Sequence, residues 1–181
     1  MSKDAKIISS SYISDHRYFK ARKDAYQMTS GKIVDPYFYV EVPPSVTAMA
    51  LTENNEVILV EQYRHPLAKK LIELPGGFID EGENPDVAIA RELLEETGYA
   101  FENIIHVGVT SGNPGVINNY TYLYLALGGK KISEQHLDPN EEIDIVLKSI
   151  DEVRMMLHNS EFIQSMHALC IFQALARLDQ I

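Results

Sequence analysis

Three glutamates of one short segment, Glu92, Glu95 and Glu96, have the spacing that most directly indicates chemistry. In an α-helix each residue advances about 100° around the axis, so the three side chains project within about 100° of one another. Close pairs of like charges destabilise a helix by about 0.2–0.5 kcal/mol each. A divalent cation removes this repulsion, because Mg²⁺ binds carboxylates together with substrate phosphates. A bare triplet of this kind is more often a solvated acidic face, so the metal site depends on the residues that surround it.

A helix from Pro85 to Thr97 is expected to carry these glutamates. Asn84 can cap its N-terminus, Pro85 suits the first helical position, and Gly98 can end it. The side of this helix opposite Glu92 is apolar, and we expect it to face the core. Its members are Leu94, Val87 and Ala90.

The loop before the helix adds residues that can support a binding site. Gly76 and Gly77 can bring backbone close to a ligand or adopt positive φ. Glu83 precedes the helix and Arg91 lies on it. The planar guanidinium of Arg91 can pair with Glu83 or Glu95 and so hold the acidic cluster in register.

The stretch from Gly77 to Tyr99 resembles the signature of the Nudix hydrolases, which is called the Nudix box. The family pattern is G-x5-E-x7-R-E-U-x-E-E-x-G-U, in which U is a bulky apolar residue. Every fixed position of the pattern is matched; the matching residues are Gly77, Glu83, Arg91, Glu92, Glu95, Glu96 and Gly98. Tyr99 stands at the final U position in place of the more usual aliphatic residue and keeps the bulk.

The resemblance implies how the metal is held. Glu92 and Glu96 would ligate it, the backbone carbonyl of Gly76 would complete its shell, and Glu95 would ligate a second metal or activate water. The implied cofactor is Mg²⁺, with Mn²⁺ as an alternative. Metal ions that bridge phosphate oxygens neutralise charge and lower the pKa of bound water, so the implied reaction is hydrolysis of a pyrophosphate bond.

The resemblance also implies the fold, an α/β Nudix fold with an α/β/α sandwich around a mixed sheet. Glu83 and Arg91 would orient the carboxylates from outside the metal shell. Helices are also expected at Ile150–His158 and Ser165–Leu178. Strands are expected at Lys6–Ile13, Tyr18–Tyr26, Tyr37–Val42, Val46–Leu51, Val57–Tyr63, Lys70–Leu74, Ile104–Thr110, Tyr120–Leu127 and Ile143–Leu147.

A second resemblance narrows the substrate. The segments Val57–His65 and Glu73–Gly77 are similar to those of the ADP-ribose pyrophosphatase branch. In that branch the arginine at the position of Arg64 reaches a substrate phosphate. Gly77, whose backbone can come close to a ligand, is a further candidate for substrate binding. Pro114, which follows Tyr99 by 15 residues, is a further mark of ADP-ribose hydrolases. The implied reaction converts ADP-ribose and water to AMP and ribose 5-phosphate.

Two parts of the sequence are candidates to supply the general base. The acidic loop, Leu137–Ile143, resembles a loop that supplies a catalytic or metal-binding glutamate in that branch. One acidic position of the pattern falls near Pro139 here, which makes Glu141 the first choice and Glu142 the second. A box carboxylate is the alternative base, and a solvated acidic turn is the alternative role for the loop.

Residues 1–42 are expected to form a small strand-rich arm and residues 43–181 the hydrolase domain. ADP-ribose hydrolases of this type form dimers by exchanging N-terminal strands that help to hold the adenine. The resemblance therefore implies a homodimer, in which a ring from Tyr12–Tyr39 can stack on the base. Packing within a sheet is the alternative role for these aromatic side chains.

Composition narrows the class of protein. The net charge of −10 does not suit a nucleic-acid binder, which needs a basic face. No apolar stretch is long enough to cross a bilayer, and Met1–Ser11 does not resemble a signal peptide. Cys170 is the one cysteine, which excludes an intrachain disulfide and suits a reducing, cytoplasmic location.

Three alternatives to ADP-ribose hydrolysis remain. The first keeps the chemistry and changes the substrate to GDP-mannose or a UDP-sugar. The second is a non-catalytic sensor of nucleotide sugars, against which the complete set of carboxylates argues. The third is a structural protein, in which the acidic stripe would have no role in binding a metal.

Overall fold

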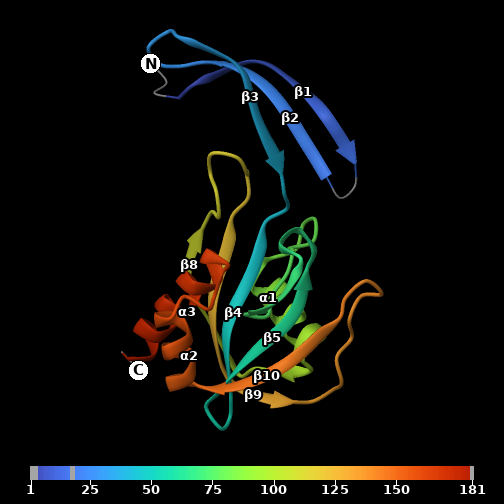
Figure 1. The fold of residues 1–181 in the computed structure, drawn as a ribbon, viewed down its shortest axis with the longest axis vertical. Helices are drawn as coiled ribbons and strands as arrows, with labels where there is room; N and C mark the ends of the chain where they lie inside the picture. Colours follow the sequence, from blue (N-terminus) through green and yellow to red (C-terminus); the bar gives the residue numbers. More distant parts are fainter. Residues whose placement is uncertain (1–3, 17–18, 180–181) are drawn as a thin grey trace. The chain divides into compact units, whose positions relative to one another are not determined.

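The computed structural model describes residues 4–16 and 19–179. The chain divides into two compact units, each with its own sheet (Figure 1). The first unit comprises residues 1–43 and 111–119, and the second comprises residues 44–110 and 120–181. The sequence patterns that carry chemistry lie in the second unit, with the exception of Pro114 and the aromatic residues of the arm.

The first unit is an antiparallel sheet of β1 (Lys6–His16), β2 (Phe19–Gln27) and β3 (Ile33–Glu41), in that spatial order. Residues 111–119 join it, because Val40 donates a backbone hydrogen bond to Val116 at 2.8 Å. The predicted strand Tyr18–Tyr26 corresponds to β2, with Tyr18 outside the described residues. The last arm strand begins at Ile33, four residues before the predicted start.

The second unit is built on a mixed sheet. Its central strands are β4 (Ser45–Thr52) and β9 (Thr121–Lys131), which run parallel to each other. The neighbouring strands pair antiparallel, in the order β10-β5-β4-β9-β7, with β6 on β5 and β8 on β9. The remaining bounds are β5 (Glu56–Arg64), β6 (Lys69–Glu73), β7 (Tyr99–Ala100), β8 (Asn103–Thr110) and β10 (Ile143–Ser149).

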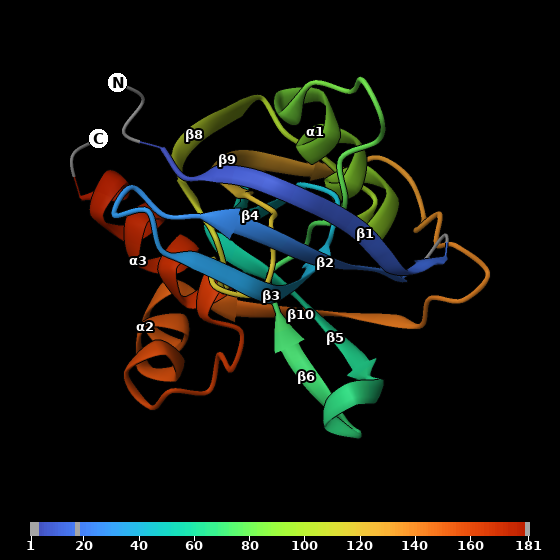
Figure 2. The ribbon, with the colours of Figure 1, turned by 90° about the horizontal axis from the view of Figure 1, so that it is seen from above.

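Helices cover both faces of this sheet. The helix α1 (Pro85–Thr97) lies on one face, and α2 (Ile150–His158) and α3 (Ser165–Leu178) lie on the other (Figure 2). A short 3₁₀ turn, His65–Leu67, links β5 to β6. Separate apolar clusters fill the two layers, one around Ile89 and Leu93 of α1 and one around Ile171 of α3. The predicted α/β/α sandwich with a mixed sheet is confirmed.

Strand β4 shows why a two-layered core forms here. From Val46 to Thr52 its side chains are buried without interruption, and Val57–Val60 of β5 are buried in the same way. When both faces of a strand are covered, apolar and polar residues do not alternate along it, and its sequence is a continuous apolar run. These two runs form the antiparallel hairpin that the sequence predicts, with Ala50 opposite Ile58.

The helix α1 has the predicted ends. The side chain of Asn84 accepts a hydrogen bond from the Asp86 amide at 2.8 Å, and Pro85 occupies the first turn. Gly98 ends the helix with φ of 75°, and its amide donates to the carbonyl of Leu94. This left-handed conformation favours glycine because it carries no Cβ.

The predicted buried side of α1 is wrong. Val87 is 59% exposed, Ala90 is exposed, and Leu94 is only partly buried. The residues that face the sheet are instead Ala88, Ile89, Leu93, Glu96 and Thr97. Side chains three and four positions apart share a helix face, so Glu92 and Glu96 border the core-facing stripe instead of opposing it. The acidic stripe and the apolar stripe are thus neighbours.

No helix in the described part of the chain is long and apolar enough to cross a membrane.

Candidate active site

The acidic side chains of α1 differ sharply in exposure. Glu96 is 5% exposed, Glu92 is mostly buried, and the side chain of Glu95 is 43% exposed. The difference follows from the helix register, because Glu96 lies over the sheet while Glu95 lies on the outer edge. One carboxylate is therefore placed in a largely dry environment and another where water reaches it.

The Pro75–Gly77 segment lies against β4 and contacts this buried carboxylate. The Gly76 amide donates to Oε2 of Glu96 at 2.8 Å. A Cβ on Gly76 would lie 2.2 Å from the Val46 carbonyl oxygen, and the φ of Gly76 is +146°, so this position excludes a side chain. The carbonyls of Pro75 and Gly77 accept hydrogen bonds from Ala48 and Val46. No hydrogen bond to the Gly76 carbonyl is found among residues 4–16 and 19–179.

Gly77 makes room for Glu92. A Cβ at this position would lie 2.6 Å from each of the two Glu92 carboxylate oxygens. Such a distance is well inside van der Waals contact, so the Glu92 carboxylate can take this position only beside a glycine. The two glycines that precede the helix thus have separate roles, one toward Glu96 and the other toward Glu92.

Arg91 is the centre of the charge network. Its Nε and Nη2 donate to the two oxygens of Glu83, each at 2.9 Å. Its Nη1 donates to Glu92 and to Glu95, also at 2.9 Å. Nη2 also donates to the Phe78 carbonyl at 3.1 Å. Arg91 therefore pairs with both residues that the sequence offered as partners, and it reaches Glu92 as well.

Burial and charge set the proton affinities of these groups. Burial raises the pKa of Glu96 to about 8 and that of Glu92 to about 7, although Arg91 opposes the effect at Glu92. The hydrogen bonds from Arg91 lower the pKa of Glu83 to about 2. Two buried carboxylates side by side need a proton or a cation to balance them. Glu83, by contrast, stays charged and holds Arg91.

The oxygen donors of this cluster fit a hard divalent cation. Glu92 and Glu96 lie one turn apart, and the Gly76 carbonyl nearby has no hydrogen-bond donor among the described residues. Oxygen ligands of this kind are what Mg²⁺ binds. In the described part of the chain, the side chains of Glu92 and Glu96 are paired with Arg91 and Gly76, and no three His, Cys, Asp or Glu side chains converge as ligands of one ion.

Arg64 ends β5 close to this cluster, and its partner is a residue that the sequence analysis did not single out. Nε of Arg64 donates to both oxygens of Glu73, at 3.0 and 3.2 Å. Glu73 is 2% exposed, whereas the Arg64 side chain is 42% exposed. The hydrogen bonds to Glu73 raise the pKa of Arg64, and the negative charge of Glu96 adds to this effect. The feature of the sequence that could have indicated Glu73 is its position as a charged residue directly before the apolar Leu74.

Glu141 lies within electrostatic range of the same carboxylates. Its negative charge contributes to the raised pKa of both Glu92 and Glu96. Glu141 is exposed, and its Oε2 accepts a hydrogen bond from the Asp138 amide at 3.1 Å, which closes a turn within the acidic loop. Glu142 is exposed in the same loop. Among the described residues, Glu141 thus acts on the buried carboxylates through its charge, without a hydrogen bond or ion pair to them.

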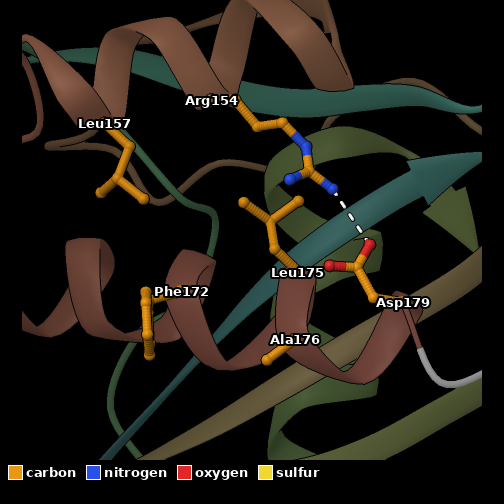
Figure 3. Close-up of a pocket in the computed structure, with 6 residues that line it drawn as sticks. All are labelled: Arg154, Leu157, Phe172, Leu175, Ala176 and Asp179. Carbon is orange, nitrogen blue, oxygen red and sulfur yellow. Dashed lines mark hydrogen bonds and ion pairs between the residues drawn. The ribbon is translucent and has the colours of Figure 1, made fainter.

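Pro114 belongs to the first unit, where it is exposed in the segment 111–119. A hollow between α2 and α3 is also separate from the carboxylates, because it lies on the face of the sheet opposite α1. Figure 3 shows that Arg154 and Asp179 form an ion pair across its rim, at 3.1 Å. Its other lining residues are Leu157, Phe172, Leu175 and Ala176. This hollow contains none of the predicted site residues.

Comparison with known proteins gives the family. The model of the NUDIX domain matches residues 42–166, which include every residue of the acidic cluster. The chain belongs to the Nudix family. The segment from Gly77 to Tyr99 is therefore its Nudix box, and the geometry described above for Glu92, Glu96 and Arg91 is the geometry of that box.

The chain is also similar to proteins that have been given a function. The methanol dehydrogenase activator of Bacillus methanolicus is 31% identical over 169 residues, covering 93% of this chain and 91% of that protein. The ADP-ribose pyrophosphatase of Bacillus subtilis is 26% identical over 160 residues, covering 80% and 86%. That of Mycobacterium tuberculosis is 32% identical over 145 residues, covering 80% and 69%.

A solved structure supports the fold. The crystal structure of an ADP compounds hydrolase superposes with a TM-score of 0.85 and covers 97% of this chain and 95% of its own, at 18% sequence identity. At 18% identity the match supports the fold of this Nudix chain but gives no information about its substrate.

Proposed function

We propose that this Nudix chain hydrolyses the pyrophosphate bond of ADP-ribose to AMP and ribose 5-phosphate, with Mg²⁺ as cofactor and Mn²⁺ as a substitute. The observation that carries the proposal is the buried carboxylate of Glu96 and the mostly buried one of Glu92, beside the Gly76 carbonyl. The ADP-ribose pyrophosphatases among the relatives support the choice of substrate.

The residues have distinct proposed roles. Glu92, Glu96 and the Gly76 carbonyl would hold the cation, with Glu95 available for a second one. When bound, the metal neutralises phosphate oxygens and lowers the pKa of water. Arg64 would bind a phosphate with the part of its guanidinium that Glu73 does not occupy. Glu83 and Arg91 keep the box side chains in place.

The chemical step needs a base. An oxygen of water forms a bond to one phosphorus, the bridging phosphoanhydride bond to that phosphorus breaks, and the proton of the water moves to a carboxylate. Glu141 is the first candidate, because it is exposed, lies in a loop and acts electrostatically on Glu92 and Glu96. Glu95 is the second, because it is the most accessible carboxylate of the box. Glu142 is the third.

The test of the substrate is a panel of ADP-ribose, GDP-mannose and UDP-sugars, with product identification in the presence of Mg²⁺. AMP and ribose 5-phosphate as the fastest-formed products are expected. If GDP-mannose or a UDP-sugar is hydrolysed faster than ADP-ribose, that compound is the preferred substrate and the proposal of ADP-ribose is wrong. Binding without turnover of every compound would instead support the role of a nucleotide-sugar sensor.

A homodimer in the cytoplasm forms part of the proposal. The described strands of the first unit leave large apolar side chains exposed; these are Ile7, Ile8, Tyr12, Ile13, Phe19, Ile33 and Phe38. Small sheets of this kind gain stability when another surface covers them. Light scattering is expected to give twice the mass of one chain, and a monomer at micromolar concentration would contradict it.

A second candidate function is activation of a dehydrogenase. The relative that covers 93% of this chain is a methanol dehydrogenase activator, and it matches over nearly the whole length of both proteins. The test adds the purified chain to methanol dehydrogenase and measures its rate. If the chain raises the dehydrogenase rate and Glu96→Gln does not, activation depends on the Nudix site. A dehydrogenase rate that the chain leaves unchanged would exclude this second function.

A further inference from the structure

The C-terminal end of α1 is held by a segment that comes much later in the chain. The last carbonyls of a helix have no partners within it and must find donors elsewhere. Here the Glu95 carbonyl accepts from the His136 amide at 2.8 Å, and the Glu96 carbonyl accepts from the Gln135 side chain at 2.6 Å. The backbone that carries two of the box carboxylates is thus fastened by residues 135 and 136.

Gln135 makes a second hydrogen bond with the same side-chain nitrogen. Its Nε2 also donates to the Ile143 carbonyl at 3.1 Å. A side-chain amide nitrogen has two hydrogens, so both bonds can form together. Ile143 begins β10, where it is buried and paired with Gln62 of β5. The partly buried Gln135 therefore connects the end of α1, the start of the acidic loop and the start of β10.

The acidic loop has few other attachments in the described structure. Asp138 through Glu142 are exposed, and the hydrogen bonds of this stretch join Asp138 to Glu141 within the loop itself. Those internal bonds fix the shape of the turn but not its place relative to α1. The two bonds of Gln135 tie both ends of the loop to the backbone of Glu96, and they add to the His136–Glu95 bond at one end and the pairing of β10 with β5 at the other.

We infer that Gln135 is a positioning residue, which sets the Glu141 carboxylate relative to the carboxylates of α1. The inference rests on the proposed function, in which Glu141 serves the hydrolysis. In this role Gln135 takes no part in the chemical step. It acts through Glu141, so its loss should lower turnover more than substrate binding.

The test variant is Gln135→Met, which keeps the length of the side chain and removes both donors. Its matched control is Gln173→Met, the same change at an exposed position of α3. We expect kcat for ADP-ribose to fall by at least about tenfold in the first variant, since a displacement of about 1 Å at a catalytic group can cost 10²-fold. KM should stay within about twofold, and the control should match the wild type in both. A wild-type kcat in Gln135→Met overturns the inference.

A double variant separates positioning from a general structural effect. If Gln135 acts through Glu141, then Gln135→Met combined with Glu141→Gln should be no slower than Glu141→Gln alone. Losses that multiply overturn the inference, and so does a wild-type rate in Glu141→Gln.

Amide hydrogen exchange gives a readout that does not depend on turnover. Exchange of the His136 amide, which donates to the Glu95 carbonyl, and of the amides in the last turn of α1 should become at least tenfold faster in Gln135→Met than in Gln173→Met. Unchanged exchange overturns the inference, whether or not the wild type hydrolyses any tested substrate. Absence of hydrolysis by the wild type counts against the proposed function and not against the inference. If Gln135→Met does not fold, the same measurements apply to Gln135→Glu, which keeps the shape and turns the donors into acceptors.

Discussion

Gly77 and Glu92 approach so closely that a Cβ on the glycine would lie 2.6 Å from both carboxylate oxygens of the glutamate. The atoms in the way are the far end of a flexible side chain. Any side chain at position 77 therefore moves the Glu92 carboxylate and leaves the backbone in place. This makes Gly77 a means of displacing a proposed metal ligand without altering its chemical type.

We expect Gly77→Ala to fold with nearly the wild-type free energy of unfolding and to lose at least about 10²-fold in turnover, because the Glu92 carboxylate is displaced by more than about 1 Å. Steady-state kinetics and urea unfolding measure the two effects. Gly108→Ala is the control, since its Cβ would make only an ordinary contact with Leu123 at 3.8 Å. A Gly77→Ala protein with wild-type turnover would show that Glu92 need not lie where it does.

Removal of Arg64 is expected to affect stability through Glu73. Arg64→Met leaves the buried Glu73 carboxylate without its partner, so the free energy of unfolding should fall by about 1–3 kcal/mol. Glu73→Gln in the same chain should recover much of that loss, because a neutral amide costs less to bury. KM for ADP-ribose should rise at least tenfold in both proteins, because the phosphate contact is missing from each. Arg64→Met with an unchanged KM would remove Arg64 from the substrate site.

Metal binding is expected to stabilise the fold. A ligand at a hundred times its dissociation constant adds about 2.7 kcal/mol to the free energy of unfolding. Saturating Mg²⁺ should therefore raise Tm, and EDTA should reverse the rise and abolish hydrolysis. Glu96→Gln should remove most of the Mg²⁺-dependent rise, and Glu102→Gln, on the exposed side of the unit, should retain it. A Tm that does not respond to Mg²⁺ in the wild type would argue against a metal at this cluster.

His167 makes stability depend on pH. Its Nδ1 accepts a hydrogen bond from the Leu74 amide at 3.3 Å, and burial lowers the pKa of His167 to about 4. Unfolded histidine has a pKa of about 6.5, so below that pH the unfolded chain binds a proton that the folded chain does not. This contribution is complete above pH about 6.5 and is lost as the pH falls toward about 4.

The expected size of that loss is on the order of 2–3 kcal/mol at pH about 4.5 relative to pH 7.5. It should be visible as a difference between wild type and His167→Gln, whose side-chain oxygen can still accept from Leu74. His158→Gln, at an exposed helix end, should behave as the wild type does. Equal pH dependence in wild type and His167→Gln would contradict the assignment.

Local signals allowed much of the fold to be predicted. The ends of α1 follow from Asn84, Pro85 and Gly98, each of which acts on its own backbone or its near neighbours. The β4–β5 hairpin follows from two apolar runs with a short polar break. The order of the strands in the sheet, including the parallel pair β4 and β9, depends on contacts between distant segments and could not be obtained in this way.

The buried side of α1 was predicted wrongly for a physical reason. Charged residues usually lie toward water, so the sequence pattern predicts Glu92 and Glu96 on the outer side of the helix. Here they lie next to Ile89 and Leu93 on the covered side. Gln135 and Glu73 were not singled out because their partners, a helix-end carbonyl and a strand-end arginine, are brought close only by the fold.

The proximity of Glu96 to the apolar contacts of α1 has a practical consequence for protein engineering. Ile89 and Leu93 are fully buried, and any change in their volume will shift the helix that carries the carboxylates. Attempts to improve thermal tolerance by repacking this layer therefore also alter the candidate active site. Substitutions at outward positions such as Ala90 and Val87 leave that layer untouched and are the safer places to begin.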